Sequence, residues 1–475
     1  MTIKFGTDGW RAVISETFTF ANLRLVAQAI ADFILEEDGR NPSVIIGFDT
    51  RFLSDRYAAE VARVMAANRI DTWLARADTP TPAISYTVHN KQATAGVMIT
   101  ASHNAPRYNG VKLKASFGGA ASPAQHQRVE QLLERNLARA HGPNLMDFQE
   151  AVRQDRIHKF DPSWAYYEHL STLVDLDCIS AGELRLVADG MYGSGRGVFG
   201  EMLARGRSHV LNIRHEMNPG FGGIHPEPIA QHLGLLISTI QAGHWDVGLA
   251  TDGDADRIGA VDAQGNFVDP HRIFALVLRY LLEKRGLRGK VVRTVSTTRM
   301  VDRIAARHGL ELVETPVGFN HIADLMIANG VVMGGEESGG MSIQGHIPEG
   351  DGILMGLLLL EVMAEAKAPL HELVADLLAQ YGPAQYARTD MPLARPVEKR
   401  QMVRQLLENA PPEIAGVSVE DVQTVDGVKY YLADGSWLLI RPSGTEPVLR
   451  VYAEAPDDGR VQALLGFGEE VSGRG

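Results

Sequence analysis

Cysteine is almost absent from this chain of 475 residues. Cys178 is the only one, so no disulfide can form within the chain, and a reducing, cytoplasmic setting is expected. The N-terminal residues lack the apolar core of a signal peptide. An apolar run at residues 352–360 stops at Glu361, which is too short a run to span a membrane and predicts a buried helix. We therefore expect no membrane partner.

Basic residues are also fewer than acidic residues in this chain. Asp and Glu together number 58 against 46 Lys and Arg, and the formal net charge is −12. This balance argues against a nucleic-acid partner, although a local basic pocket remains compatible with it.

The chain is too long for one hydrophobic core, so three or four domains are expected. Residues 20–35 and 54–67 have helical spacing, with Ser54 as the expected cap, and residues 44–48 form an apolar strand pattern. The strand-then-helix pattern returns at 184–188 and 290–295. The sequence thus predicts three similar α/β domains with mixed, mostly parallel sheets.

The C-terminal part has a different pattern. Strand patterns at 428–432, 436–440 and 448–452 are preceded or joined by Asp-Gly pairs, which are typical of hairpins, and 398–409 is helical. These features predict a smaller antiparallel α+β domain. The expected domains are residues 1–155, 156–265, 266–385 and 386–475.

A candidate reactive serine lies in the segment 100–106. Ser102, followed by His103 and Asn104, comes just after the apolar strand pattern at 95–99. A hydroxyl where a strand passes into a loop is held firmly and can still be reached, as a nucleophile or phosphate carrier requires. Glycines do not flank the serine as in Gly-x-Ser-x-Gly, so a serine hydrolase is not indicated.

A candidate metal loop follows the strand pattern at 245–250. Asp252, Asp254 and Asp256 alternate with small residues, and carboxylates are ligands of the right hardness for Mg²⁺. The segment must curl for the three oxygens to converge on one ion. An EF-hand is excluded because its sixth position would be Arg257 and its twelfth Ala263.

Two glycine-containing loops offer groups for a sugar and a phosphate. Glu336 and Ser338, flanked by glycines, combine a carboxylate with a hydroxyl, which suits vicinal sugar hydroxyls. Arg441 has the planar fork that binds phosphate, and the residues that follow offer hydroxyls and an anion nest. These following residues are Ser443, Gly444 and Thr445.

Two further cations lie beside glycine-rich turns, Arg11 after Gly6–Trp10 and Lys112 after Asn109. Residues 195–200 match the Gly-x-Gly-x-x-Gly dinucleotide pattern, but six residues separate the first glycine from the preceding strand. A glycine-rich helix start explains that match better than a nicotinamide cofactor does.

Together, in this order, these motifs resemble the α-D-phosphohexomutase family over nearly the whole chain. The resemblance implies four domains around a central cleft, a phosphoserine at Ser102 and Mg²⁺ on the three aspartates and Ser102. It also implies sugar contacts from Glu336 and Ser338, and a phosphate site at Arg441, Ser443, Gly444 and Thr445. Arg11, Lys112 and Arg257 match family positions near the transferred phosphate.

The chain departs from the family pattern at two loops. Gly339 and Gly340 stand where phosphoglucosamine mutases and many phosphomannomutases carry a histidine, so the triplet at 336–338 is more similar to phosphoglucomutases. Asn320 stands where another family loop often has lysine. Both departures bear on the choice of sugar.

The expected function is a mutase that moves phosphate between C1 and C6 of a hexose phosphate, with glucose preferred and glucose 1,6-bisphosphate as activator. His103 or Lys112 would act as the general base. A phosphomannomutase, a phosphoglucosamine mutase, a metal-dependent sugar phosphatase and a non-catalytic sugar-phosphate sensor are the alternatives. A monomer or dimer is expected, with the last domain closing over the substrate.

Overall fold

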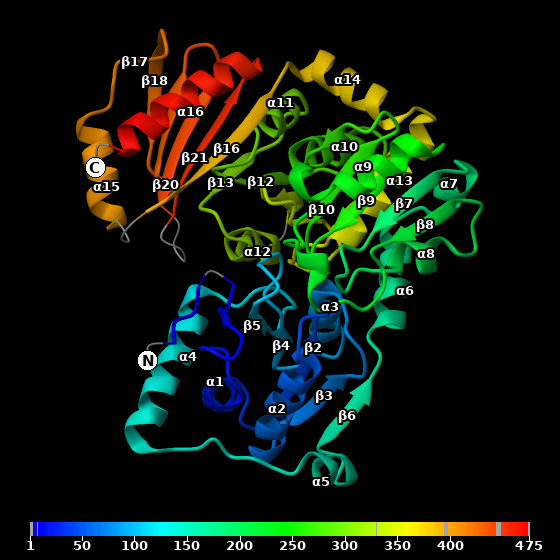
Figure 1. The fold of residues 1–475 in the computed structure, drawn as a ribbon, viewed down its shortest axis with the longest axis vertical. Coiled ribbons are helices and arrows are strands. Elements are labelled where there is room, and N and C mark those ends of the chain that lie inside the picture. The colour runs from blue at the N-terminus through cyan, green and yellow to red at the C-terminus, as the bar shows by residue number, and fades with distance from the viewer. Residues whose placement is uncertain (1–2, 7, 329, 394–397, 443–447, 474–475) are drawn as a thin grey trace.

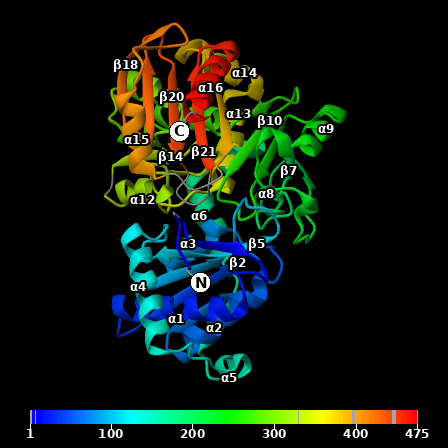
Figure 2. The same ribbon diagram turned by 60° about the vertical axis from the view of Figure 1, so that its left-hand side comes forward.

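The computed structural model describes residues 3–6, 8–328, 330–393, 398–442 and 448–473 (Figure 1). The described residues form four sheets in chain order, three mixed and one fully antiparallel. The predicted fold class is therefore confirmed. Figures 1 and 2 both show the sheet formed by the C-terminal residues, in orange and red, above the first sheet, in blue and cyan.

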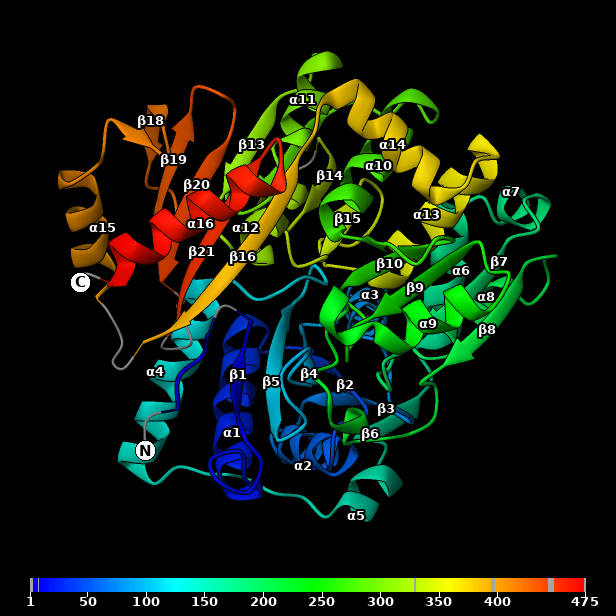
Figure 3. The ribbon, with the colours of Figure 1, turned by 45° about the horizontal axis from the view of Figure 1, so that its top comes forward.

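The first sheet has the strand order β1-β5-β4-β2-β3-β6. Its strands β2, β3 and β4 are parallel, and β2 and β4 are buried almost throughout, as expected for apolar runs covered by helices on both faces. Figure 3 shows the sheet with α1 and α2. The elements are β1 (Trp10–Val13), α1 (Phe20–Glu37), β2 (Ser43–Phe48), α2 (Ser54–Ala67), β3 (Asp71–Ala75), α3 (Thr81–Asn90), β4 (Ala95–Ile99), β5 (Tyr108–Ala115), α4 (Pro123–Arg139), α5 (Phe148–Arg153) and β6 (Ile157–Phe160).

The prediction that Ser54 caps α2 is wrong. The capping position is Leu53, and the Ser54 hydroxyl instead donates a 2.9 Å hydrogen bond to Asp49 Oδ1 inside the domain. The Ser54 hydroxyl is therefore hydrogen-bonded to a buried carboxylate and not to the backbone at the start of the helix.

The second sheet has the order β11-β10-β9-β7-β8. The elements of this part are α6 (Ser163–Leu173), α7 (Leu176–Ala181), β7 (Arg185–Asp189), α8 (Val198–Leu203), β8 (His209–Ile213), η1 (Phe221–Gly223), η2 (Ala230–His232), α9 (Gly234–Ala242), β9 (Val247–Thr251), β10 (Ile258–Asp262) and β11 (Phe267–Val268). The first sheet runs to Phe160 and the second to Val268, so each extends a few residues past the domain boundary expected at 155 and at 265.

The third sheet has the order β13-β12-β14-β15. Its elements are α10 (Pro270–Glu283), β12 (Lys290–Thr294), α11 (Met300–Arg307), β13 (Leu312–Thr315), α12 (Phe319–Ile327), β14 (Val331–Gly335), β15 (Met341–Ile343), α13 (Gly352–Ala366) and α14 (Leu370–Tyr381). Helix α13 is buried from Gly352 to Ala364, which confirms the buried helix predicted there. It packs in one hydrophobic core that joins the second and third sheets, whereas the first sheet has a core of its own.

The fourth sheet is antiparallel throughout, in the order β16-β21-β20-β19-β18-β17. Hairpins at the two Asp-Gly pairs join β18 to β19 and β19 to β20, as predicted. Helix α16 packs across β16, β20 and β21 (Figure 3). The elements are β16 (Gln385–Pro392), α15 (Lys399–Glu408), β17 (Glu413–Ile414), β18 (Val417–Gln423), β19 (Val428–Leu432), β20 (Trp437–Pro442), β21 (Val448–Ala455) and α16 (Asp458–Gly473).

Within the described part of the chain, none of the helices combines the length and the apolar character that crossing a bilayer requires.

Candidate active site

Ser102 lies in the loop between β4 and β5, directly after a fully buried strand. Its backbone has φ = +51°, in the left-handed region that residues other than glycine rarely adopt. Its hydroxyl donates a 2.8 Å hydrogen bond to Asp252 Oδ2, and His103 Nδ1 lies 3.4 Å from the same hydroxyl oxygen. The loop therefore aims the serine at the second domain.

Ser102 is 0% exposed, which contradicts the expectation of a hydroxyl that is held firmly and can still be reached. The cause is the loop of the second domain that follows β9. A Cβ placed on Gly253 would lie only 2.5 Å from the Ser102 carbonyl oxygen, so the two loops are in direct contact.

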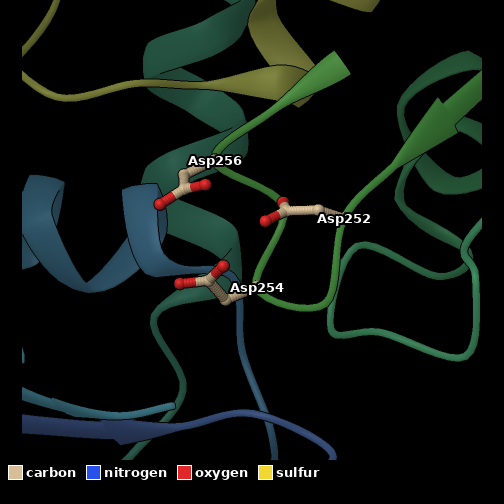
Figure 4. Close-up of side chains that lie close together, drawn as sticks. All are labelled: Asp252, Asp254 and Asp256. Carbon is tan, nitrogen blue, oxygen red and sulfur yellow. The ribbon is translucent and has the colours of Figure 1, made fainter. Parts of the chain in front are cut away.

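Asp252, Asp254 and Asp256 come from the curled loop between β9 and β10 (Figure 4). One carboxylate oxygen from each lies within 4.8 Å of the others. Asp252 accepts hydrogen bonds from the Ser102 hydroxyl and from the Arg257 backbone N–H. Burial, followed by repulsion from Asp256 and Asp254, raises the pKa of Asp252 well above its usual range.

The three aspartates fit a divalent cation. Asp254 Oδ1 and Asp256 Oδ1 are buried and have no hydrogen-bond partner among the described residues. Two unpartnered carboxylate oxygens, converging with a third carboxylate, are the hard donors that Mg²⁺ prefers. The triad could therefore hold a metal ion.

Lys112 projects from β5 into the same group of carboxylates. Its Nζ lies 2.8 Å from Asp8, 2.9 Å from Asp254 and 2.7 Å from Asp256. Burial alone would lower the pKa of Lys112, but Asp254, Asp256 and Asp8 outweigh it and raise that pKa well above its usual range. The ammonium group therefore neutralises part of the charge of the triad.

The other predicted cations lie nearby. Arg11 Nη1 donates a 2.6 Å hydrogen bond to Asn104 Oδ1, which ties β1 to the serine loop. Arg257 Nε lies 3.8 Å from Asp256 Oδ1. Burial, followed by the charges of Arg257 and Arg11, lowers the pKa of His103 well below its usual range, so this imidazole is neutral. The structure thus gathers Ser102, its predicted cations and the triad at one place.

The loop predicted to bind the sugar, residues 336–340, lies between β14 and β15. Glu336 accepts hydrogen bonds from the Gly318 N–H, at 2.9 Å, and from the Ser338 hydroxyl, at 3.4 Å. Burial raises the pKa of Glu336 to about 7, although Arg257 opposes that change. A Cβ on Gly339 would lie 2.8 Å from the Ile258 carbonyl oxygen, so this loop packs directly beside the metal loop.

Arg441 lies on β20, and its Nε donates a 2.6 Å hydrogen bond to Asp426 Oδ2. The same carboxylate pairs with Lys399 and accepts a 3.2 Å hydrogen bond from the Val317 N–H. Arg441 is thereby connected to the loop that precedes α12. Ser443, Gly444 and Thr445, the rest of the predicted phosphate site, lie outside the described residues.

Sequence reasoning missed several residues that build the site. Asp8 contacts Lys112, and Thr81 Oγ1 donates a 2.6 Å hydrogen bond to Asp254 Oδ2. Asp49 and Arg51 follow β2 just as Ser102 follows β4. Charged residues at the end of a buried strand are the signal that could have pointed to these two.

The fold and the site define the class. This is a multidomain α/β protein in which a serine hydroxyl, an acidic loop that could hold a metal ion, and the cations Lys112, Arg11 and Arg257 meet. Family models of phosphoglucomutase/phosphomannomutase match the chain over residues 2–140 (α/β/α domain I), 164–265 (domain II), 269–381 (domain III) and 395–466 (C-terminal domain).

Similar proteins agree with these models. A probable phosphoglucosamine mutase of Methanopyrus kandleri is 32% identical over 97% of this chain and 95% of its own. A phosphoglucomutase/phosphomannomutase of Thermococcus kodakarensis is 29% identical over 98% and 97%. A crystal structure of a "putative phosphomannomutase" from Thermus thermophilus is 32% identical, with a TM-score of 0.86 over 100% of this chain and 99% of its own.

The chain therefore belongs to the phosphoglucomutase/phosphomannomutase family, the α-D-phosphohexomutases, as the resemblance of its motifs indicated. It is an enzyme of intramolecular phosphate transfer.

Proposed function

We propose that this chain moves a phosphoryl group between C1 and C6 of a hexose phosphate by way of phospho-Ser102 and a hexose 1,6-bisphosphate. The observation that carries the proposal is the 2.8 Å hydrogen bond from the Ser102 hydroxyl to Asp252 of the triad. A phosphoryl group on that oxygen would lie at the acidic loop, beside Lys112 and Arg257.

Each transfer is a balanced exchange. The bond between phosphorus and Ser102 Oγ breaks and a bond to the free sugar hydroxyl oxygen forms. A base takes the proton of that hydroxyl, and Ser102 Oγ takes up a proton as it leaves. The bisphosphate then reorients in the site and returns its other phosphoryl group to Ser102. Positioning and charge neutralisation account for most of the catalysis of phosphoryl transfer.

Each group of site residues has a different role in this transfer. Asp252, Asp254 and Asp256 would hold Mg²⁺, whose charge offsets that of the phosphoryl group during transfer. Lys112, Arg11 and Arg257 supply further positive charge at the same place. His103, whose neutral imidazole lies 3.4 Å from Ser102 Oγ, is the candidate for the base, because the raised pKa of Lys112 keeps that side chain protonated. Glu336 and Ser338 would bind sugar hydroxyls, and Arg441 the non-reacting phosphate.

The preferred sugar phosphate is inferred from the names of similar proteins. The sequence pattern at 336–340 favours glucose, whereas similar proteins are named for glucosamine phosphate or for mannose phosphate. We therefore rank glucosamine and mannose phosphates ahead of glucose phosphate. A trace of the corresponding 1,6-bisphosphate should activate the enzyme by phosphorylating Ser102.

The test is a mutase assay with the 1-phosphates of glucosamine, mannose and glucose, each with a trace of its bisphosphate and Mg²⁺. Ser102→Ala should lower kcat by at least about 10³-fold because the covalent route depends on that oxygen. Intact mass should show one phosphoryl group on the wild type and none on the variant. Ser171→Ala, on the exposed face of α6, is the control and should behave as wild type.

Two results would contradict the proposal. One is mutase activity that survives Ser102→Ala. The other is steady release of inorganic phosphate that is unaffected by this substitution, which would identify a metal-dependent phosphatase instead.

A further inference from the structure

Arg51 is a buried arginine directly beneath the serine loop. It follows β2 in the loop that leads to α2, and its side chain is 0% exposed. The ring of Phe221, from the second domain, lies 5.0 Å from its guanidinium carbon. No substrate can touch Arg51 in this position, so any effect it has on catalysis passes through the residues it contacts.

The guanidinium group donates four hydrogen bonds, all to backbone carbonyls of the serine loop. Nη2 donates to the carbonyls of Ser102 and Asn104, both at 2.6 Å. Nη1 donates to those of Ala105, at 2.9 Å, and Tyr108, at 3.0 Å. One planar group therefore determines the path of the backbone from the serine to the start of β5.

Asp49 anchors this arginine and also the threonine that precedes the serine by two residues. Its carboxylate lies 3.2 Å from Arg51 Nε and accepts a 2.6 Å hydrogen bond from the Thr100 hydroxyl. Thr100 Oγ1 in turn accepts a 2.8 Å hydrogen bond from the Ser102 N–H. The backbone N–H and C=O of Ser102 are thus both connected to the pair Asp49 and Arg51.

This arrangement explains how Ser102 keeps its unusual backbone. A left-handed φ at a residue other than glycine persists only where the surroundings enforce it. Here the two backbone hydrogen bonds of Ser102 enforce it, and the same conformation points Oγ at Asp252.

We propose that Arg51 is a positioning residue for the reaction, which holds the Ser102 loop so that Oγ faces the metal loop. The proposal rests on the proposed function, in which Ser102 carries the phosphoryl group. Lysine cannot replace this arginine, because it presents three donors on a flexible stem instead of a planar fork. A misplacement of about 1 Å can cost about 10²-fold in rate.

The test compares Arg51→Lys with Arg214→Lys. Arg214 is a matched control, because it is also buried and also pairs with a carboxylate at the end of a parallel strand, Asp189 of β7. Thr100→Val removes the hydroxyl between Asp49 and Ser102 and gives a second variant. For each variant, kcat, KM, the midpoint of thermal unfolding and the rate at which hexose 1,6-bisphosphate phosphorylates Ser102 are measured.

Arg51→Lys should lower kcat by about 10²-fold with little change in KM, and should slow the phosphorylation of Ser102. Arg214→Lys should lower the unfolding midpoint similarly and leave kcat at the wild-type value. Hydrogen exchange at residues 101–108 should rise in Arg51→Lys and in Thr100→Val but not in Arg214→Lys.

The proposal is overturned if Arg51→Lys loses no more kcat than Arg214→Lys, or if exchange at residues 101–108 is unchanged. A wild-type chain that neither interconverts the sugar phosphates nor takes phosphate on Ser102 would refute the proposed function. The exchange measurement would still decide for or against Arg51, because it requires no turnover.

Discussion

Lys112 shows how single residues share the charge of this site. Its ammonium group contacts three carboxylates, those of Asp8, Asp254 and Asp256, and it is itself buried. Removing one member of a buried ion pair costs about 3–5 kcal/mol because the remaining charges lose their partner. Lys112→Met should therefore lower the free energy of unfolding by about this amount.

Magnesium should partly reverse that loss. A cation that binds the folded chain stabilises it by mass action, and the carboxylates freed by Lys112→Met should bind Mg²⁺ more tightly. Unfolding in urea with and without Mg²⁺ measures the effect. Lys114→Met is the control, since Lys114 is equally buried but pairs with Glu349 at 2.6 Å and with Asp8 at 3.8 Å rather than with the three aspartates. Equal stabilisation of both variants by Mg²⁺ would contradict the argument.

At the scale of elements, the serine loop and the metal loop are in direct contact at Gly253. Gly253→Ala places a Cβ 2.5 Å from the Ser102 carbonyl oxygen, which is backbone and cannot rotate away. The two loops must separate, so kcat should fall by about 10²-fold and stability by about 1–3 kcal/mol.

A glycine in open space provides the comparison for that variant. Gly234→Ala, in the first turn of α9, meets no atom within 4 Å and should leave both kcat and stability near the wild-type values. If Gly253→Ala keeps full activity, the contact between the two loops has no part in catalysis.

Several elements around the site could be predicted from the sequence, but the contacts between them could not. The strand before Ser102, the curled aspartate loop and the hairpins at the Asp-Gly pairs follow from local periodicity and turn chemistry, and the structure has them. Burial of Ser102 depends on a contact with the second domain, which no local pattern encodes. The bond from Ser54 to Asp49 spans only five residues, but the pattern of a helix start does not show that a buried carboxylate competes for the hydroxyl. Arg51 was missed because its four acceptors lie more than fifty residues further along the chain.

At the scale of the whole molecule, a buried ionic cluster joins the third sheet to the fourth. Lys429 on β19 donates a 2.6 Å hydrogen bond to the Val295 carbonyl and a 3.1 Å hydrogen bond to Glu314 on β13. Arg293 on β12 pairs with the same glutamate and with Asp302. Burial, followed by the charge of Arg293, lowers the pKa of Lys429 to about 7, although Glu314 opposes that change.

The stability of this interface should therefore depend on pH. Between pH 7 and 10.5 the unfolded chain holds a proton on Lys429 that the folded chain has released, so the free energy of unfolding should rise with pH. This one group gives a slope of at most about 1.4 kcal/mol per pH unit. Below pH 7 both the folded and the unfolded chain hold the proton, so Lys429 no longer makes the stability depend on pH. Lys429→Met removes the titrating group, so the free energy of unfolding of this variant should rise less steeply with pH than that of the wild type.

Trp437, one of five tryptophans of the chain, contributes to the signal for this measurement at the interface, where it is buried and Lys429 Nζ lies 4.4 Å from the centre of its ring. Urea unfolding followed by tryptophan fluorescence, on wild type and Lys429→Met near pH 7 and near pH 10, gives the slope for each. If the stability of the wild type relative to the variant falls or stays constant over this range, Lys429 keeps its proton in the folded chain. In that case Glu314 outweighs burial and Arg293, and the link between the third and fourth sheets is an ordinary ion pair that does not respond to neutral pH.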